Sequence, residues 1–312
     1  MKKIKLGFAG TPNVAFAHFS HLLNNPNIEF SFILTQPDKK SGRGLEESKS
    51  LFYKYAEEIA VFQPTSLSDQ GTKDQLMNFD IDLLVVVAYG KLLPKWLLSF
   101  PKFGSLNVHF SLLPKWRGAA PIQRAIENGD KITGISFMKI IDELDAGPVY
   151  SNFVVDIENN DFFQVEKKLL GVSLDNINSI IHLITSGSIE PKEQINKEAT
   201  YAEKIVPKKD ALIDWSWSSK LIKNKYLAYK KWPILSFQIN GEKVQIHELD
   251  VLSGKSGSPG EIHSFNKESL SVFCKDGSIE IKSVKFPGKK VISSIDFFNA
   301  KRDIISSGDI LV

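Results

Sequence analysis

Residues 82–90 read DLLVVVAYG, and the five residues from Leu83 to Val87 are all apolar. A strand that is apolar on both faces is typical of the centre of a parallel sheet whose two faces are covered by helices. The N-terminal sequence fits such a sheet, because IKLGFAG at residues 4–10 is a second apolar run that ends in glycine. It is followed by TPNVAFAHFSHLL, which has the spacing of an amphipathic helix with proline near its start.

Strand and helix patterns alternate on both sides of the central run. Strands are predicted at FSFILTQPD (30–38), at SLNVHFSLL (105–113) and at GISFMKII (134–141), with a helix at about 119–127. This order predicts an α/β domain with a Rossmann-like, mostly parallel sheet. In such sheets ligands bind outside the carboxyl ends of the strands.

The pattern changes in the second half of the chain. A long helix is expected at about 161–186, and the polar stretch that follows reads as a linker. Two segments then read as hairpins, with Asn240-Gly241 and Asp276-Gly277 at their turns. Short strands with turn signals predict a small β-barrel of the OB-like type. The predicted organisation is an α/β domain at 1–190, a linker at 191–207 and a β-barrel domain at 208–312.

Composition narrows the class of protein. The 312 residues are 42% hydrophobic and 24% charged with a net charge of +3, as expected for a globular protein. The single cysteine, Cys274, excludes an internal disulfide. No apolar run approaches the roughly 20 residues that span a bilayer. The apolar run in MKKIKLGFAGTP is too short for a secretory signal and reads as a first strand, so a cytoplasmic protein is expected.

The stretch LNVHFSLLPKWRG, residues 106–118, places Asn107 and His109 two positions apart in an apolar strand. Side chains at positions i and i+2 of a strand point to the same face. A buried polar pair must be hydrogen-bonded or it costs stability, so the pair is either structural or faces a substrate. A lone histidine in a strand is more often structural, and no other histidine stands at metal-ligand spacing, so no metal is predicted.

Carboxylates follow the next predicted strand. Asp142, Glu143 and Asp145 would lie at the same edge of the sheet as His109 if the two strands are neighbours. An aspartate facing a histidine can hold the ring and favour its charged form. These residues without a serine or cysteine nucleophile suggest acyl transfer directly between two bound substrates, with the acyl oxygen polarised and a proton taken from an amine.

NVHFSLLPKWRGAAPIQRAI, residues 107–126, resembles the signature of the folate-dependent formyltransferases. Further matches lie along nearly the whole chain: FAGTP, QPDKKSGRG, VVAYGKLLP, ELDAGPV, EATYAEKI, IDWS, SPGEI and DGSIEI. The GRG loop and the C-terminal segments resemble the branch of this family that acts on methionyl-tRNA. The resemblance implies transfer of a formyl group from 10-formyltetrahydrofolate to the methionine α-amino group of initiator tRNA, in translation initiation.

The resemblance also implies residue roles. The catalytic residues would be Asn107, His109 and Asp145. Folate would contact the turn Ser111, Leu112, Leu113 and Pro114 and, on the pterin side, Tyr89, Gly90 and Leu92. The tRNA would contact Arg43 in an inserted loop, the neighbouring Lys39 and Lys40, and the C-terminal Lys208 and Lys209. The partners implied are the initiator tRNA and the folate, with no metal, no membrane and a monomeric protein.

Three departures from the family pattern and two alternatives remain open. Glu143 stands where the family usually has glycine, and LEESKS (45–50) replaces the lysines that normally follow the GRG loop. YKKWPILSF (229–237) stands where the family has a version that contains arginine and glycine. One alternative is a formyltransferase acting on a small amine such as a nucleotide sugar or glycinamide ribonucleotide. The other is a non-catalytic RNA-binding protein with a decayed enzyme domain, against which the intact Asn107, His109 and Asp145 argue.

Overall fold

The computed structural model describes residues 3–41, 46–252, 254 and 257–311, with the backbone alone at 39–41 and 46–48. The chain forms two compact units. The first comprises residues 1–121, 133–155 and 167–202, and the second comprises residues 122–132, 156–166 and 203–312. The division between residues 202 and 203 falls within the segment 191–207 that was expected to be the linker, and two internal segments, 122–132 and 156–166, belong to the C-terminal unit.

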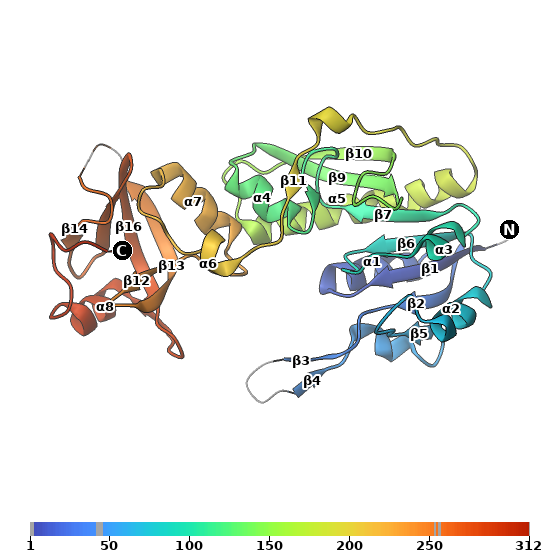
Figure 1. Cartoon of the computed structure of the whole chain (residues 1–312), viewed down its shortest axis with the longest axis horizontal. Helices are drawn as coiled ribbons and strands as arrows, with labels where there is room; N and C mark the ends of the chain where they lie inside the picture. Colours follow the sequence, from blue (N-terminus) through green and yellow to red (C-terminus); the bar gives the residue numbers. More distant parts are fainter. Residues whose placement is uncertain (1–2, 42–45, 253, 255–256, 312) are drawn as a thin grey trace. The chain divides into compact units, whose positions relative to one another are not determined.

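The N-terminal part is built around one sheet (Figure 1). Its strand order is β10-β9-β7-β6-β1-β2-β5. The strands from β7 to β5 run parallel, and β9 runs antiparallel to β7. The mostly parallel sheet predicted from the sequence is confirmed. The strands are β1 (Ile4–Gly10), β2 (Ile28–Leu34), β5 (Ala60–Phe62), β6 (Leu83–Val87), β7 (Ser105–His109), β9 (Ile132–Lys139) and β10 (Val149–Asp156).

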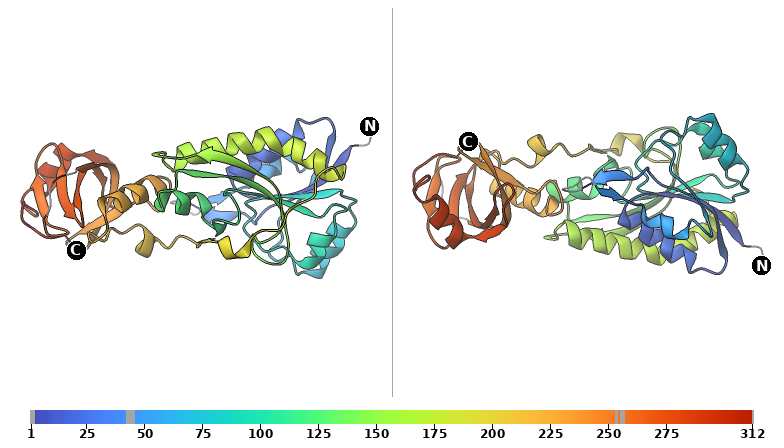
Figure 2. Two further views of the ribbon diagram at one scale, coloured as in Figure 1. Left: turned by 90° about the horizontal axis from the view of Figure 1, so that it is seen from above. Right: turned by 90° about the horizontal axis from the view of Figure 1, so that it is seen from below.

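Helices cover both faces of this sheet (Figure 2). One face packs against α1, where the rings of Phe8 and Phe19 lie 5.6 Å apart, and α1 is joined to α5 by a hydrogen bond between His18 and Ser173. The other face, with Ala9 and Val86, packs against α2 and α3. The apolar run from Leu83 to Val87 is thus buried on both sides, as its sequence predicted. The helical segments are α1 (Asn13–Leu23), η1 (Leu51–Tyr55), α2 (Gln70–Met77), α3 (Lys95–Ser99) and α5 (Phe162–Thr185).

The segment expected to be a linker is packed for much of its length. Lys192 and Val149 exchange backbone hydrogen bonds of 2.8 and 2.9 Å. Further along, β11 (Tyr201–Ala202) pairs in parallel with β8 (Arg117–Gly118). Between them lies the short 3₁₀ helix η2 (Asn196–Glu198). Residues 192–202 therefore line the N-terminal unit directly beside the loop that follows His109.

The C-terminal unit contains a curled antiparallel sheet ordered β12-β13-β16-β15-β14, with β17 paired to β16 (Figure 1). The hairpin turn at Asn240-Gly241 forms with both residues at positive φ, as the sequence predicted. In the second hairpin Cys274 pairs with Gly277, so Lys275-Asp276 forms the loop. The expected small β-barrel domain is observed as this curled sheet around an apolar core. Its elements are α6 (Pro207–Asp210), α7 (Ser219–Ala228), β12 (Ser236–Ile239), β13 (Glu242–Leu252), β14 (Ile262–Phe265), β15 (Leu270–Cys274), β16 (Gly277–Lys285), β17 (Val291–Ser293) and α8 (Ser294–Lys301).

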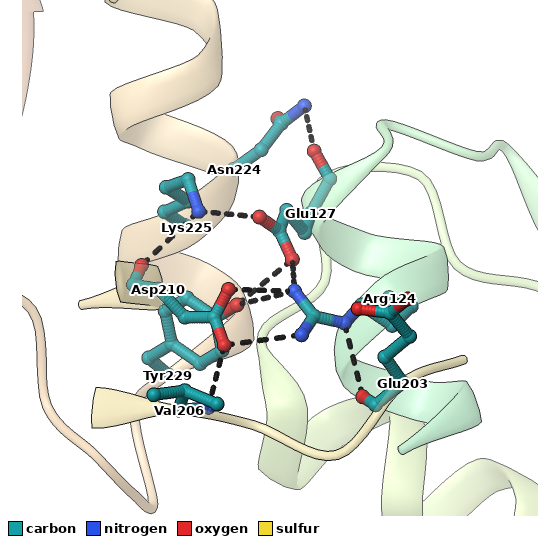
Figure 3. A network of polar contacts seen from close by, with 8 residues as sticks. All are labelled: Arg124, Glu127, Glu203, Val206, Asp210, Asn224, Lys225 and Tyr229. Atoms are coloured by element: carbon teal, nitrogen blue, oxygen red, sulfur yellow. Dashed lines mark hydrogen bonds and ion pairs between the residues drawn. The ribbon is translucent and has the colours of Figure 1, made fainter. Parts of the chain in front are cut away.

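Helix α4 (Pro121–Glu127) belongs to the C-terminal unit through a buried network of charges (Figure 3). Arg124 donates to Asp210 at 3.0 and 3.1 Å and to Glu127 at 2.7 Å. Lys225 on α7 pairs with Glu127, which also accepts from the Tyr229 hydroxyl at 2.8 Å. Burial alone would raise the pKa of Glu127, but the hydrogen bonds from Lys225 and Tyr229 outweigh it and hold that pKa below its usual value.

Among the residues that the structure describes, no helix combines the length and the apolar character needed to cross a membrane.

Candidate active site

Asn107 and His109 lie at the C-terminal end of β7, between β6 and β9. Asn107 is opposite Val86 on one side and Met138 on the other, and His109 is opposite Ser136. The His109 side chain is 6% exposed, whereas Asn107 is half-buried. Within the described part of the chain the Asn107 amide makes no side-chain hydrogen bond. Its donors and acceptor are therefore available to a ligand on the face that it shares with His109.

The His109 ring is held between two acceptors. Nε2 lies 3.0 Å from the carbonyl oxygen of Trp116, and because a carbonyl can only accept, Nε2 carries the hydrogen. Nδ1 lies 3.7 Å from Oδ2 of Asp145. A doubly protonated ring therefore has an acceptor opposite each N–H group, and the Asp145 carboxylate can balance its charge.

Asp145 does not reach His109 by the route expected from the sequence. Because β9 is antiparallel to β7, its last residue Lys139 pairs with Leu106, at the opposite end of β7 from His109. The prediction that both strand ends lie at one edge is therefore wrong. Residues 140–148 instead fold back along the sheet, and Asp145 adopts a left-handed backbone conformation with φ +48°. The carboxylate is fixed by a 2.8 Å hydrogen bond from the Gly118 backbone N–H.

The three side chains together can carry out a defined chemistry. The amide N–H of Asn107 can donate to the oxygen of an acyl group under attack, and the positive charge of a protonated His109 ring beside it can stabilise the negative charge that develops there. A carboxylate that is 14% exposed and next to the ring can accept a proton from an attacking amine. The arrangement fits acyl transfer between two bound molecules.

Comparison with known families agrees with this chemistry. Residues 1–170 match the formyl transferase family, and residues 205–302 match the formyl transferase C-terminal domain. The chain belongs to the formyl transferase family. The two matches leave residues 171–204 between them, and these include the packed segment 192–202 described above.

Relatives within the formyl transferase family span the whole chain. The methionyl-tRNA formyltransferase of Pseudomonas putida (strain GB-1) is 37% identical over 311 residues, which is 99% of each chain. That of Buchnera aphidicola subsp. Acyrthosiphon pisum (strain Tuc7) is 34% identical over 316 residues, which is 100% of each. Among solved structures, an N-formyltransferase from Helicobacter canadensis in complex with folinic acid and dTDP-3-aminofucose has a TM-score of 0.65. It is 20% identical and covers 89% of this chain and 98% of its own, which supports the shared fold.

The turn predicted to contact folate follows β7 directly. Ser111 is fully buried, and its hydroxyl donates to the Lys115 carbonyl at 2.6 Å. Leu113 is 5% exposed, and its N–H donates to Ser136 at 3.0 Å. Leu112 and Pro114 are half-buried. The Ser111 hydroxyl and the Leu113 N–H are therefore used in hydrogen bonds that stabilise the turn beside His109. Leu112 and Pro114 are the two side chains of the turn that keep exposed surface.

The residues predicted for the pterin side follow β6. Tyr89 is 1% exposed and packs in the apolar core between the sheet and helices α2 and α3. Burial raises the pKa of its hydroxyl to about 12. The Tyr89 backbone is buried as well, and its carbonyl accepts a hydrogen bond from Gln36 Nε2 at 2.7 Å, so the surface that this segment offers to a ligand lies at the neighbouring residues. Gly90 (φ +75°) and Leu92 are exposed, the latter by 78%.

The residues predicted to contact tRNA lie in two places. Arg43 lies outside the described residues. Lys39 and Lys40 belong to β3 (Lys39–Ser41), whose backbone pairs with β4 (Glu46–Ser48). Lys208 and Lys209 lie on α6 of the C-terminal unit, and both are exposed.

A cleft of about 700 Å³ opens on the N-terminal unit and is separate from these predicted sites. Its lining includes Lys95, Lys102, Lys139, Asp142 and Tyr150, and none of the residues predicted to bind folate or to act in catalysis. Lys139 is the last residue of β9, so the cleft lies toward the end of β7 that is opposite His109. The cleft and the three candidate catalytic residues share only the loop that begins at Ile140.

Two residues beside the site were not singled out by the sequence. Arg117 is 1% exposed and donates to the side-chain oxygen of Gln194, which lay in the expected linker. Glu143, the departure from the family pattern, lies 3.8 Å from Arg117 and is 65% exposed. Arg117 stood in the quoted WRG motif, but no feature of the sequence placed Gln194 against the loop that carries Asp145.

Proposed function

We propose that the protein transfers a formyl group from 10-formyltetrahydrofolate to the α-amino group of methionine on initiator methionyl-tRNA. The observation that carries this proposal is the meeting of Asn107, His109 and Asp145 in a chain that is alike over its full length to proteins named methionyl-tRNA formyltransferase. The folate is the formyl donor and is consumed as a substrate.

In the proposed reaction the methionine nitrogen attacks the formyl carbon. A new C–N bond forms, the bond from the formyl carbon to N10 of the folate breaks, and the proton lost by the amine ends on N10. Asn107 and the protonated His109 ring stabilise the negative charge that develops on the formyl oxygen. Asp145 orients His109 and accepts the proton from the amine. The half-buried Asn107 amide, which has no side-chain partner in the described part of the chain, supports its role as a donor to substrate.

The folate would lie against two loops of the N-terminal unit. One is the turn Ser111, Leu112, Leu113 and Pro114. The other is the loop with Tyr89, Gly90 and Leu92. Because Tyr89 is buried as a whole, it would support this loop from the core, while Leu92 offers exposed apolar surface to a flat ring.

The tRNA would be bound by Arg43, Lys39 and Lys40 in the N-terminal unit and by Lys208 and Lys209 on α6. The exposure of both lysines on α6 supports contact with phosphate groups, which carries no base specificity. The protein would act as a monomer in the cytoplasm, where translation initiation takes place.

A formyltransferase acting on a nucleotide sugar is the second candidate, because the Helicobacter canadensis structure with dTDP-3-aminofucose shares the fold. Its 20% identity is well below the 37% of the Pseudomonas putida relative. One assay separates the two. With 10-formyltetrahydrofolate supplied, charged initiator tRNA, free methionine and a nucleotide amino sugar are offered in parallel. We expect formylation of the charged tRNA alone, and formylation of the sugar without that of the tRNA would overturn the proposal.

A further inference from the structure

Gln194 joins a buried cation to the loop that carries Asp145. Its Oε1 accepts hydrogen bonds from Nε of Arg117 at 3.0 Å and from Nη2 at 2.8 Å. Its Nε2 donates to the Asp145 carbonyl at 2.8 Å and to the Gly147 carbonyl at 2.7 Å. The side-chain amide of Gln194 therefore makes four hydrogen bonds, two with the Arg117 guanidinium and two with backbone carbonyls of the loop.

These contacts fix which way the amide faces. A guanidinium has only donors and a carbonyl has only acceptors, so an amide turned by 180° would place like against like at both ends. Arg117 is 1% exposed and its charge is permanent, so the oxygen of Gln194 must face it. The two N–H groups then have no direction open to them except toward Asp145 and Gly147.

The two hydrogen bonds from Gln194 Nε2 are made to a strained part of the backbone. Asp145 has φ +48°, a region that residues with a Cβ atom adopt at a cost in free energy. Nothing in its own side chain relieves this, because the carboxylate is directed to the Gly118 N–H and to His109. Hydrogen bonds to its carbonyl and to the carbonyl two residues later hold the backbone in the turn that presents the carboxylate.

We infer that Gln194 is a positioning residue for the proposed formyl transfer: oriented by Arg117, it holds the Asp145 backbone so that the carboxylate stays beside His109. The inference rests on the proposed function and adds to it a residue from the segment between the two domains. The bridge between Lys192 and Val149 and the pairing of β11 with β8 fix both ends of the segment that carries Gln194, and so fix where Gln194 lies.

Gln194→Glu tests the inference with little change in volume. The new carboxylate keeps, and strengthens, its bonds to Arg117, so the buried cation is not left unpaired. The second carboxylate oxygen, an acceptor, now faces the carbonyls of Asp145 and Gly147, so both hydrogen bonds to the loop are lost. Small displacements of reacting groups can cost about 100-fold in rate. We expect kcat to fall by roughly 10- to 100-fold, with KM for folate and for tRNA changed by less than about threefold.

Asn196→Asp is the matched control. Its Oδ1 also accepts from Nη2 of Arg117, at 2.7 Å, so this variant adds the same charge beside the same guanidinium. Among the contacts of the described residues Asn196 has none with the loop 140–148. We expect its kcat to stay within about twofold of wild type. Equal losses of kcat in the two variants would show that the activity depends on charge near Arg117 and not on the hydrogen bond from Gln194 to the Asp145 carbonyl.

A double variant separates positioning from stability. In an Asp145→Ala background the carboxylate to be positioned is gone, so Gln194→Glu should reduce kcat no further. A full additional loss there, or a Gln194→Glu enzyme with wild-type kcat and an unchanged melting temperature, would overturn the inference. If the wild-type protein fails to formylate methionyl-tRNA in the same assay, the proposed function fails instead, and the two outcomes are distinct.

Discussion

Asp145 Oδ2 lies 2.8 Å from the backbone nitrogen of Gly118 and 3.7 Å from His109 Nδ1. The hydrogen bond that fixes the carboxylate therefore comes from the main chain of the loop after β7, and the histidine lies just beyond hydrogen-bond distance. That loop also supplies the Trp116 carbonyl to the other side of the His109 ring. One loop thus sets the positions of both the ring and the carboxylate.

Removing the three candidate catalytic side chains one at a time should lower kcat strongly. Loss of a single donor to a developing oxyanion typically costs on the order of 10²–10³ in rate. We expect Asn107→Ala and His109→Ala each to reduce kcat by about that factor, with Asp145→Ala comparable because it acts on both the ring and the amine. Single-turnover formylation of charged tRNA measures this, and the melting temperature serves as the folding control. Near-normal kcat for His109→Ala or Asp145→Ala in a folded protein would rule the mechanism out.

Gly118→Ala should damage the same site through the backbone. Gly118 has φ +117°, and an added Cβ would lie 2.8 Å from the carbonyl oxygen of Ala202. Relief requires β8 to move from β11, which draws the Gly118 N–H away from Asp145. We expect kcat to fall by about tenfold and stability by roughly 1–3 kcal/mol.

Gly171→Ala is the control for that substitution, because on α5 an added Cβ meets nothing within 4 Å. Alanine in a helix interior is favoured over glycine by about 1 kcal/mol, so this variant should be at least as stable as wild type and fully active. A Gly118→Ala enzyme with the stability and kcat of Gly171→Ala would contradict the role given to the Gly118 N–H.

The sequence predicted the sheet well because its signals are local. The apolar run at 83–87, the alternation of strand and helix, and the pair Asn107 and His109 each depend on a few neighbouring residues. The path of Asp145 does not. It depends on β9 being antiparallel to β7, and one strand's apolar pattern carries no information on the direction of its neighbour. Gln194 was missed for a related reason, since a polar segment reads as a linker until its backbone partners, 149 and 117–118, are known.

Tyr89→Phe should stabilise the N-terminal unit. The Tyr89 hydroxyl is buried and has no hydrogen-bond partner among the described residues, so it carries a desolvation penalty in the folded state. Such a group costs about 1–3 kcal/mol, and phenylalanine removes it without opening a cavity. We expect a gain of about 1 kcal/mol in the free energy of unfolding, measured by urea denaturation, with KM for folate unchanged because the buried Tyr89 hydroxyl is out of reach of a ligand. A loss of stability would mean that the hydroxyl has a partner, such as a buried water molecule.

His18 should make the N-terminal unit less stable as the pH falls. Burial lowers the pKa of its ring from 6.5 to about 4, so the folded protein holds it neutral between Val14 and Ser173 while the unfolded chain takes up a proton near pH 6.5. Stability is therefore fully present above pH 6.5 and is lost progressively as the pH falls toward 4. The ring should contribute a loss of about 2 kcal/mol between pH 7.5 and pH 5.

Urea denaturation at the two pH values measures the His18 effect. His18→Gln should lessen the pH dependence by that amount, whatever it does to stability at pH 7.5. His182→Gln, which removes an exposed histidine from α5, is the control and should leave the dependence in place. If His18→Gln and wild type lost stability in parallel, burial of this ring would not be the cause.

The buried charges of Figure 3 give a last prediction, for the C-terminal unit. Lys225 is 5% exposed, pairs with Glu127 and donates to the Asp210 carbonyl at 3.1 Å. Lys225→Met leaves the Glu127 carboxylate, which is only 16% exposed, without that cation, and breaking a buried pair from one side typically costs about 3–5 kcal/mol. Lys282→Met removes an ion pair of 2.8 Å in which the Lys282 side chain is 37% exposed and the Asp250 side chain is 53% exposed. This change should cost less than about 1 kcal/mol. Hydrogen exchange of the amides in α4 and α7 measures the difference locally.

Because the pKa of Glu127 is lowered in the folded state, the loss of stability in Lys225→Met should be largest above about pH 5 and shrink as the pH falls and the carboxylate takes up a proton. Equal protection in the two variants, or a loss that grows toward low pH, would show that this network does not hold α4 in the C-terminal unit.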